Sequence, residues 1–369
     1  MGPEARLFRS SPFIELKRLD DLTAEQRERF RELENDPEFY GLFVPKPPLT
    51  MNLKSVTRPA AELFQSLATP SHLDVNDDVI DMLLDGILEI ENGDGFVFGA
   101  DAFPMICARH PEREPRDLGW RALLHAQDLE TNDTQALTMA LYFYNRIPAS
   151  PFWTTRFANR DAILAYVGAD RGTLRTLLDR EWIASTSNGW LSWSSKSRTA
   201  RTAAEVTYKL YVSPRPERMR DAFEIVVRVL SGFPGTQFKI GDSAAGLLRS
   251  DKFVLYFKTR NELDEAAAEL RRELAGCDAQ GVPFTAGLDD HGLLSWGMDP
   301  PENDRALQWL WNDSWRLWLV KRLGAAISIA KLARTPNALE PWRFAIERAR
   351  RHGVDVETWT PSASLWSTT

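Results

Sequence analysis

The sequence has few cysteines and histidines and no excess of positive charge. Its 369 residues include 2 cysteines and 5 histidines, and the formal net charge is -7. Cys107 and Cys277 lie far apart without a partner motif, which argues against a disulfide framework or a structural zinc site and suits a reducing cytoplasm. Proteins that bind DNA or RNA neutralise phosphates with Lys and Arg, so we expect no nucleic-acid partner.

The sequence also has no long apolar run. Its first residues, MGPEARLFRS, contain no apolar segment of signal-peptide length. The most apolar later stretch, residues 309–332, is interrupted by Asp313, Arg316 and Lys321. This stretch therefore predicts a buried or amphipathic helix and not a membrane span. We expect a cytoplasmic protein without a membrane partner.

Tryptophan, by contrast, is abundant. The chain has 13 tryptophans, and Trp309, Trp311, Trp315 and Trp318 fall in one predicted helix. Aromatic side chains pack protein cores and also line peptide and small-molecule pockets. For any single tryptophan, core packing is the commoner role.

Residues 1–110 are predicted to form an N-terminal domain of helices and hairpins. Its clearest element is a helix followed by a hairpin over residues 77–99, in which Asn92-Gly93 and Asp94-Gly95 supply the backbone freedom that tight turns require. The sequence also predicts helices over residues 22–36 and 59–68 and a strand over residues 49–57.

Residues 111–200 are predicted to hold a linker, a helix and a second helix with a hairpin. Residues 171–193 repeat the earlier order, with a helix ending in Leu-Leu-Asp, a strand, Asn188-Gly189 and another strand. A helix that runs into a two-stranded wing is typical of winged-helix units. Such units often bind DNA, which the acidic charge disfavours, and some bind leader peptides of ribosomally made natural products by adding the peptide as a strand.

Residues 201–369 are predicted to form a second, α+β domain. Over residues 206–299 the order is strand, helix, strand, strand, helix, strand, which is the order of a split βαβ sandwich, with its last strand at residues 281–288. Two flanking helices follow, one around Ser314 and one over residues 340–352. The fold class expected for the whole chain is therefore α+β.

Four phrases of the chain, together with the predicted helix around Ser314, resemble a known family. The phrases are YKLYVSPRPE at residues 208–217, FKIGDSAAGLLRSDKFVLYF at 238–257, GVPFTAGL at 281–288 and ARRHGVDVETWTPS at 349–362. Together they resemble the HopA1-like family, which is named after a type III effector and is also found in biosynthetic clusters for ribosomally made, modified peptides. The resemblance extends over residues 157–366.

The first 150 residues resemble a narrower group through FYGLF, LDGILEIE and FVFGADAF. These phrases are similar to the peptide-binding proteins of crocagin-type biosynthesis, in which a precursor peptide is held while its last residues are modified. The resemblance implies a precursor peptide as partner, with a peptide-modifying oxygenase as a second partner.

The resemblance also implies a catalytic alternative, a lyase that eliminates phosphate from phosphoserine or phosphothreonine in a precursor peptide. Such a reaction needs a base, typically Lys, and cations that hold the phosphate. Where the family usually has a Lys and an Arg, this chain has Ala286 and Leu319. Arg316 or His291 could substitute, but neither occupies the matching position. The departure weakens the lyase alternative.

Two short motifs could suggest a metal. His72-Leu73-Asp74 has the spacing of part of a facial-triad iron site, but Asp74 is better explained as a helix cap. The loop from Asp289 to Gly292 could bind a cation through carboxylates, although a solvated turn is the commoner interpretation. We expect no metal and no cofactor.

Our interpretation is a non-catalytic, or catalytically reduced, protein that holds a ribosomal precursor peptide for modification. A phosphopeptide lyase and a winged-helix DNA-binding regulator are the alternatives. Lys239, Asp242, Arg249 and Asp251 could instead have a purely structural role, as ion pairs at the edge of the sheet. Each such pair, if exposed, would stabilise the fold by about 1 kcal/mol or less. The candidate peptide contacts are Trp182, Trp190, Trp193, Lys239, Asp242, Arg249 and Asp251.

Overall fold

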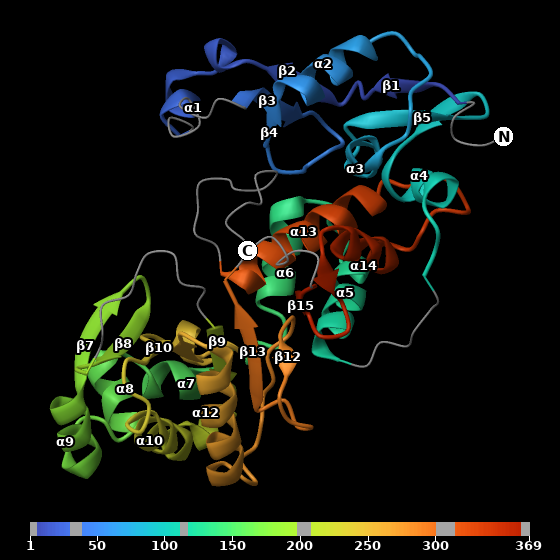
Figure 1. Cartoon of the computed structure of the whole chain (residues 1–369). Coiled ribbons are helices and arrows are strands. Elements are labelled where there is room, and N and C mark those ends of the chain that lie inside the picture. Colours follow the sequence, from blue (N-terminus) through green and yellow to red (C-terminus); the bar gives the residue numbers. More distant parts are fainter. Residues whose placement is uncertain (1–5, 30–38, 111–116, 198–207, 300–313, 363–369) are drawn as a thin grey trace.

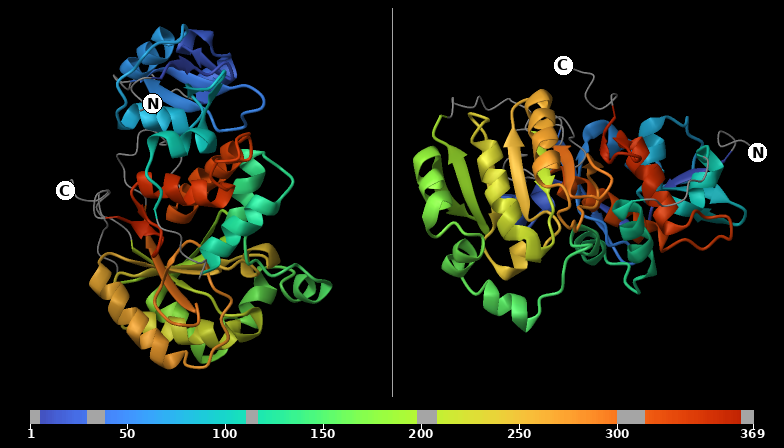
Figure 2. Two further views of the ribbon diagram at one scale, coloured as in Figure 1. Left: turned by 90° about the vertical axis from the view of Figure 1, so that its right-hand side faces the viewer. Right: turned by 90° about the horizontal axis from the view of Figure 1, so that it is seen from below.

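The computed structural model is an α+β protein, which confirms the predicted fold class. It describes residues 6–29, 39–110, 117–197, 208–299 and 314–362. Figure 1 shows an N-terminal part of strands and helices, a middle layer of helices, and a sheet with its own helices, and the same order is visible in Figure 2 (left). Two large hydrophobic cores stabilise this arrangement, one in the first two parts and one beneath the sheet.

Two small antiparallel sheets form the N-terminal part, in the orders β1-β5-β6 and β2-β3-β4. The strands are β1 (Phe8–Ser10), β2 (Ile14–Lys17), β3 (Phe39–Pro45), β4 (Lys54–Thr57), β5 (Leu88–Asn92) and β6 (Gly95–Val97). The helices are α1 (Ala24–Arg29), α2 (Arg58–Ser66), α3 (Asp77–Leu84) and α4 (Gly99–Ile106), with a 3-10 turn at Leu19–Asp21.

The predicted helix and hairpin at residues 77–99 is confirmed. Asn76 begins α3, because its side chain accepts the N–H of Val79 at 2.9 Å, and Gly93 turns the hairpin with φ of +63°. The strand expected over residues 49–57 is shorter than predicted. Part of the helix expected at residues 22–36 lies outside the described residues.

A layer of four helices follows, built from segments far apart in the sequence. Helices α5 (Leu118–Asp128) and α6 (Thr134–Tyr142) pack against α13 (Trp315–Ala330) and α14 (Pro341–Arg351), and the short strands β14 (Val354–Asp355) and β15 (Thr360–Pro361) follow them. Gly324 lets α13 approach α6 closely, because a Cβ there would lie 2.5 Å from Thr138 Oγ1.

The tryptophans of α13 are core residues. Trp315 and Trp318 are buried, and their rings stack with centroids 4.8 Å apart. The Trp309 and Trp311 that we expected in the same helix lie outside the described residues. Gly353, with φ of +75°, follows α14, which confirms the predicted helix end.

A seven-stranded antiparallel sheet forms the third part, in the order β12-β13-β9-β11-β10-β8-β7. The strands are β7 (Trp182–Ser187), β8 (Trp190–Ser195), β9 (Tyr208–Val212), β10 (Gln237–Gly241), β11 (Phe253–Phe257), β12 (Ala286–Gly287) and β13 (Leu294–Met298). Around them lie α7 (Pro151–Arg156), α8 (Arg160–Tyr166), α9 (Gly172–Glu181), a 3-10 turn at Pro216–Arg218, α10 (Met219–Leu230), α11 (Ala244–Leu247) and α12 (Arg260–Glu273).

Strands β9, β10, β11 and β13 have the topology of the predicted split βαβ sandwich. Their order across the sheet is β13-β9-β11-β10. Helix α10 connects β9 to β10, and α12 follows β11 on the way to β13. Alternate residues such as Phe238, Ile240 and Leu255 point into the core beneath those helices. The intervening residues, among them Lys239 and Val254, lie on the opposite face.

Two details of the sequence prediction were wrong. The last sandwich strand is β13, and residues 281–288 contribute only the two-residue β12, because Phe284 has φ of +61° and the chain turns at Asp289. The second predicted hairpin, β7 and β8, is not a separate wing, because β8 pairs with β10 and so extends the sheet. The alternation of apolar and polar residues in β8 predicted which face of the strand is buried, but it could not predict which strand pairs with β8.

The predicted domain boundaries at residues 110 and 200 stay a prediction. Strands from both sides of residue 200, β8 and β9, belong to the same sheet. None of the described helices combines the length and the apolarity that a bilayer span requires.

Candidate functional site

One face of the seven-stranded sheet carries most of the predicted site residues. We call it the polar face, and it is the face that points away from α10 and α12. Strand register places Ser192, Lys239, Val254, Tyr211 and Ser295 in one row across it, from β8 to β13. Close to this row lie α6 and α13, and polar or charged side chains from these two helices and from the sheet converge there.

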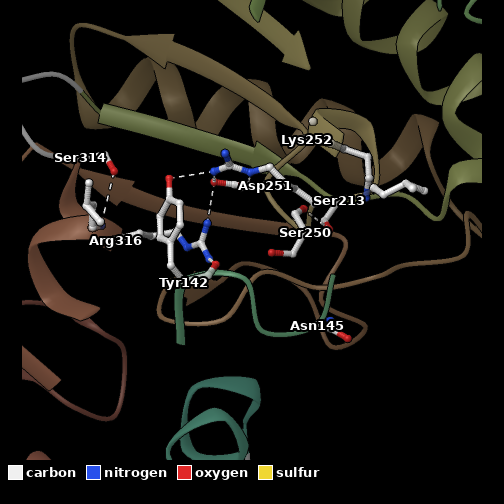
Figure 3. A network of polar contacts seen from close by, with 12 residues as sticks. Tyr142, Asn145, Ser213, Ser250, Asp251, Lys252, Ser314 and Arg316 are labelled. Atoms are coloured by element: carbon white, nitrogen blue, oxygen red, sulfur yellow. Dashed lines mark hydrogen bonds and ion pairs between the residues drawn. The ribbon is translucent and has the colours of Figure 1, made fainter. Parts of the chain in front are cut away.

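Asp251 is the centre of an ion network at this junction (Figure 3). Its carboxylate accepts two hydrogen bonds from Arg249, both at 2.7 Å, and pairs with Arg316 at 2.6 Å. Arg249 also donates to the hydroxyl of Tyr142 at 2.8 Å. Burial raises the pKa of Asp251, but Arg316 and then Arg249 outweigh this and lower the pKa to about 2. The network therefore joins the start of β11 to α13 and to the end of α6.

Arg316 is the most deeply buried member of the network. Its side chain is 1% exposed, and it also donates to the carbonyl oxygens of Pro283 and Tyr142, each at 3.1 Å. The sequence suggested Arg316 only as a substitute for the expected arginine. An arginine within an apolar helix is rarely buried without a partner of opposite charge, so the sequence around Arg316 already indicated a buried ion pair. Leu319, at the expected position, is a core residue.

A second buried network adjoins the first and was missed by the sequence interpretation (Figure 3). Lys252 is 0% exposed, and its ammonium donates to the carbonyl of Pro214 at 2.9 Å and to the side chain of Gln280. Gln280 in turn donates to the carbonyl of Asn145 at 2.6 Å. Burial lowers the pKa of Lys252 to about 7. These contacts fix the loop before β12 against the sheet, which is a structural role.

Lys239 differs from the other cations of the polar face. Its ammonium lies 4.2 Å from the ring centroid of Trp190 and 5.4 Å from that of Tyr256. It makes no hydrogen bond and no ion pair with the residues that the structure describes, although it is half-buried. Burial, followed by repulsion from Lys209, lowers the pKa of Lys239 to about 8. Chemically, it can bind an anion or accept a proton.

The structure separates the seven predicted site residues into three groups. Trp190, Lys239, Arg249 and Asp251 lie together on or beside the polar face. Asp242 instead pairs with Arg160 at 3.1 Å.

The remaining two, Trp182 and Trp193, are buried on the opposite face of the sheet. Trp193 stacks on Phe238 with centroids 5.0 Å apart, and Trp182 meets the same ring edge-on at 4.8 Å. Peptide binding stays a prediction, and these two core residues do not support it.

The acidic loop at residues 289–292 is a structural turn. Both carboxylate oxygens of Asp289 accept backbone N–H groups, including that of Gly292 at 2.6 Å and that of Leu294 at 2.6 Å. Throughout the described residues, no group of three or more His, Cys, Asp or Glu side chains is arranged to hold a metal ion.

Comparisons with known proteins give little further information. No family model matches the chain, and no curated protein matches it. The chain is distantly similar to two solved structures of bacterial effectors. One is an effector protein from Pseudomonas syringae pv. tomato strain DC3000, at a TM-score of 0.37 and 11% identity, with 66% of this chain and 95% of that chain covered. The other is from P. syringae pv. syringae strain 61, at 0.38 and 11%, covering 68% and 99%.

Proposed function

We propose that this protein binds an extended peptide by adding it as a strand along β7, and that the peptide is a ribosomal precursor held for modification. The observation that carries the proposal is the edge strand itself. Strand β7 has six residues, ends the sheet, and has only β8 as a neighbour among the described strands. Strand addition of this kind recurs in peptide recognition.

The hydrogen-bonding pattern fixes which backbone groups of β7 are available. Asn188 and Gly189, with φ of +48° and +84°, form a two-residue turn, and the N–H of Lys196 donates to the carbonyl of Glu181 at 2.8 Å. Antiparallel ladders alternate between residues that bond to the partner strand and residues that do not. The N–H and C=O groups of Ala184 and Thr186 therefore point away from β8.

Within its described residues, strand β7 lacks the sequence features that usually protect an edge strand from pairing. Natural sheets protect their edges with Lys, Pro, bulges or very short strands. Strand β7 contains neither Lys nor Pro, its register with β8 is unbroken, and five of its six residues are exposed. Ile183, at 57% exposure, is one of two large exposed apolar side chains among the described residues. An edge with these properties favours a partner strand.

The identity of the peptide rests on the resemblance to precursor-peptide-binding proteins. In that setting the protein would present the peptide to a separate modifying enzyme, an oxygenase in the crocagin-like case, and would itself need no reacting group. The cytoplasm is the expected location.

The test is Ala184→Pro, which deletes an outward-pointing N–H without deleting a bond to β8. Proline is tolerated at such edge positions. Ala184→Val is the matched control, because it keeps the N–H and favours a strand. We expect the affinity for a precursor peptide encoded near this gene, measured by calorimetry, to fall about tenfold or more in the proline variant alone. Equal affinities in two folded variants would refute strand addition at β7.

A phosphopeptide lyase is a second candidate, and the state of Lys239 favours it. A half-buried lysine whose pKa is about 8 is suited to proton abstraction. Incubation with a phosphoserine peptide should then release phosphate, seen as a mass loss, and Lys239→Ala should abolish the release. Without such a loss in the unaltered protein, the binding function stands alone.

A further inference from the structure

Among the described residues, the carboxylates of the polar face do not compensate its positive charge. Four cations lie near one another there, Lys209, Lys239, Arg249 and Arg316, and the carboxylates that pair with them are Asp299 and Asp251. Asp251 is shared between the two arginines, and Asp299 pairs with Lys209. Of the described cations at this face, Lys239 has no carboxylate partner within the described residues, in a protein whose net charge is -7.

The surroundings of Lys239 make the lack of a carboxylate partner among the described residues energetically unfavourable. A half-buried ammonium loses much of its hydration and needs a hydrogen-bonding or ionic partner in return. Trp190 and Tyr256 offer only the faces of their rings, at 4.2 Å and 5.4 Å, which attract the charge but accept no conventional hydrogen bond. The three ammonium hydrogens have no hydrogen-bond acceptor among the described residues.

Arg249 adds a second donor to the same place. Its guanidinium carbon lies 5.4 Å from the centroid of Trp190, the ring that also contacts Lys239. Its Nε and one terminal nitrogen are used by Asp251 and Tyr142, whereas the other terminal nitrogen makes no hydrogen bond with the described residues. A guanidinium in this state can receive an oxyanion without losing its existing ion pair.

We infer that Trp190, Lys239 and Arg249 form a binding site for an oxyanion, a carboxylate or a phosphate, on the polar face. Lys239 supplies the charge, Arg249 supplies the directed N–H group, and the indole shields the pair from water. Trp190 and Lys239 are both half-buried, so a ligand has access to them. The site does not depend on strand addition at β7, because Trp190 belongs to β8 and Lys239 to β10, and the free edge of β7 faces away from both.

Protection from acylation tests this inference directly. The folded protein is treated briefly with an amine-acylating reagent near neutral pH, and each lysine is quantified by peptide mass spectrometry. The probes are inorganic phosphate, sodium acetate and, at equal ionic strength, sodium chloride. At a probe concentration ten times the dissociation constant, we expect labelling of Lys239 to slow about tenfold. Lys196, an exposed lysine that donates to the Asp179 carbonyl, is the internal control.

The outcomes separate the sources of the ligand. Protection by acetate supports a carboxylate ligand, and protection by phosphate alone supports a phosphorylated one. Equal labelling of Lys239 in all three salts, or equal protection of Lys196, would overturn the inference. Ala184→Pro should leave the protection of Lys239 unchanged, so failure of this site and failure of strand addition can be told apart. Lys239→Met should also remove any thermal stabilisation that phosphate or acetate gives over chloride.

Discussion

Replacing Asp251 by asparagine is the sharpest test of the ion network that joins the sheet to the helical layer. Asp251→Asn keeps the shape of the side chain but removes the charge that Arg249 and Arg316 share. Both pairs are largely buried, since the side chains of Arg316 and Asp251 are 1% and 8% exposed. Breaking a buried pair from one side costs about 3–5 kcal/mol, because the remaining charge keeps no compensation.

The pKa of Asp251 gives a second and smaller value for the contribution of the network to the free energy of unfolding. Lowering the pKa from 3.8 to about 2 corresponds to about 2 kcal/mol of stability at neutral pH. Because the folded-state pKa is the lower one, this contribution is complete above the unfolded-state value of 3.8. It is lost as the pH falls from there towards 2. The mutational cost is larger because asparagine also leaves two buried guanidinium groups without a charged partner.

Urea denaturation at neutral pH measures this cost, and Asp242→Asn is its matched control. Asp242 pairs with Arg160, which is 54% exposed, so its charge should contribute about 1 kcal/mol or less. We expect a clearly lower midpoint for Asp251→Asn and a nearly unchanged one for Asp242→Asn. A cost for Asp251→Asn no greater than for the control would show that the network does not stabilise the fold.

Two other substitutions test the packing of the helical layer. Gly324→Ala should lower stability by about 1–3 kcal/mol, because the new Cβ would lie 2.5 Å from Thr138 Oγ1, whereas Gly95→Ala, with no atom within 4 Å, should not. Burial and then the neighbouring Arg348 and Arg322 lower the pKa of His352, which Asp85 partly opposes. Stability should therefore fall as the pH drops below 6.5, and less so in His352→Gln; an unchanged slope in thermal melts would contradict this.

Local signals in the sequence predicted most of the elements, because those signals are local in origin. Asn188-Gly189 as a turn and Gly353 as a helix end act within a few residues, and both were placed correctly. The cap of α3 was misplaced by two residues, because it is Asn76 and not Asp74. The βαββαβ order also followed from local periodicity. The pairing of β8 with β10 could not be predicted, because alternation fixes which face of a strand is buried but not its neighbour.

The candidate site was predicted only in part, because its residues lie close together in sequence but their partners do not. Lys239, Arg249 and Asp251 were recognised from one phrase, but the role of each depends on distant residues. Asp251 pairs with Arg316 from α13, Asp242 pairs with Arg160 from α8, and Lys239 has no carboxylate partner within the described residues. Trp182 and Trp193 have the aromatic character of pocket residues, yet they lie on the core side of strands whose faces only the assembled sheet defines.

The two proposed sites lie on one sheet, and their spacing constrains a shared ligand. A strand added to β7 would lie three strand spacings from Lys239, across β7, β8 and β10. With neighbouring strands about 4.8 Å apart, this is about 14 Å, which four or five extended residues can span. A peptide paired with β7 could therefore place a carboxylate against Lys239 only if that group lies at least four or five residues beyond the paired segment. Peptides truncated inside that distance should keep strand pairing but lose the contribution of Lys239, which ties the length of the ligand to the geometry of the polar face.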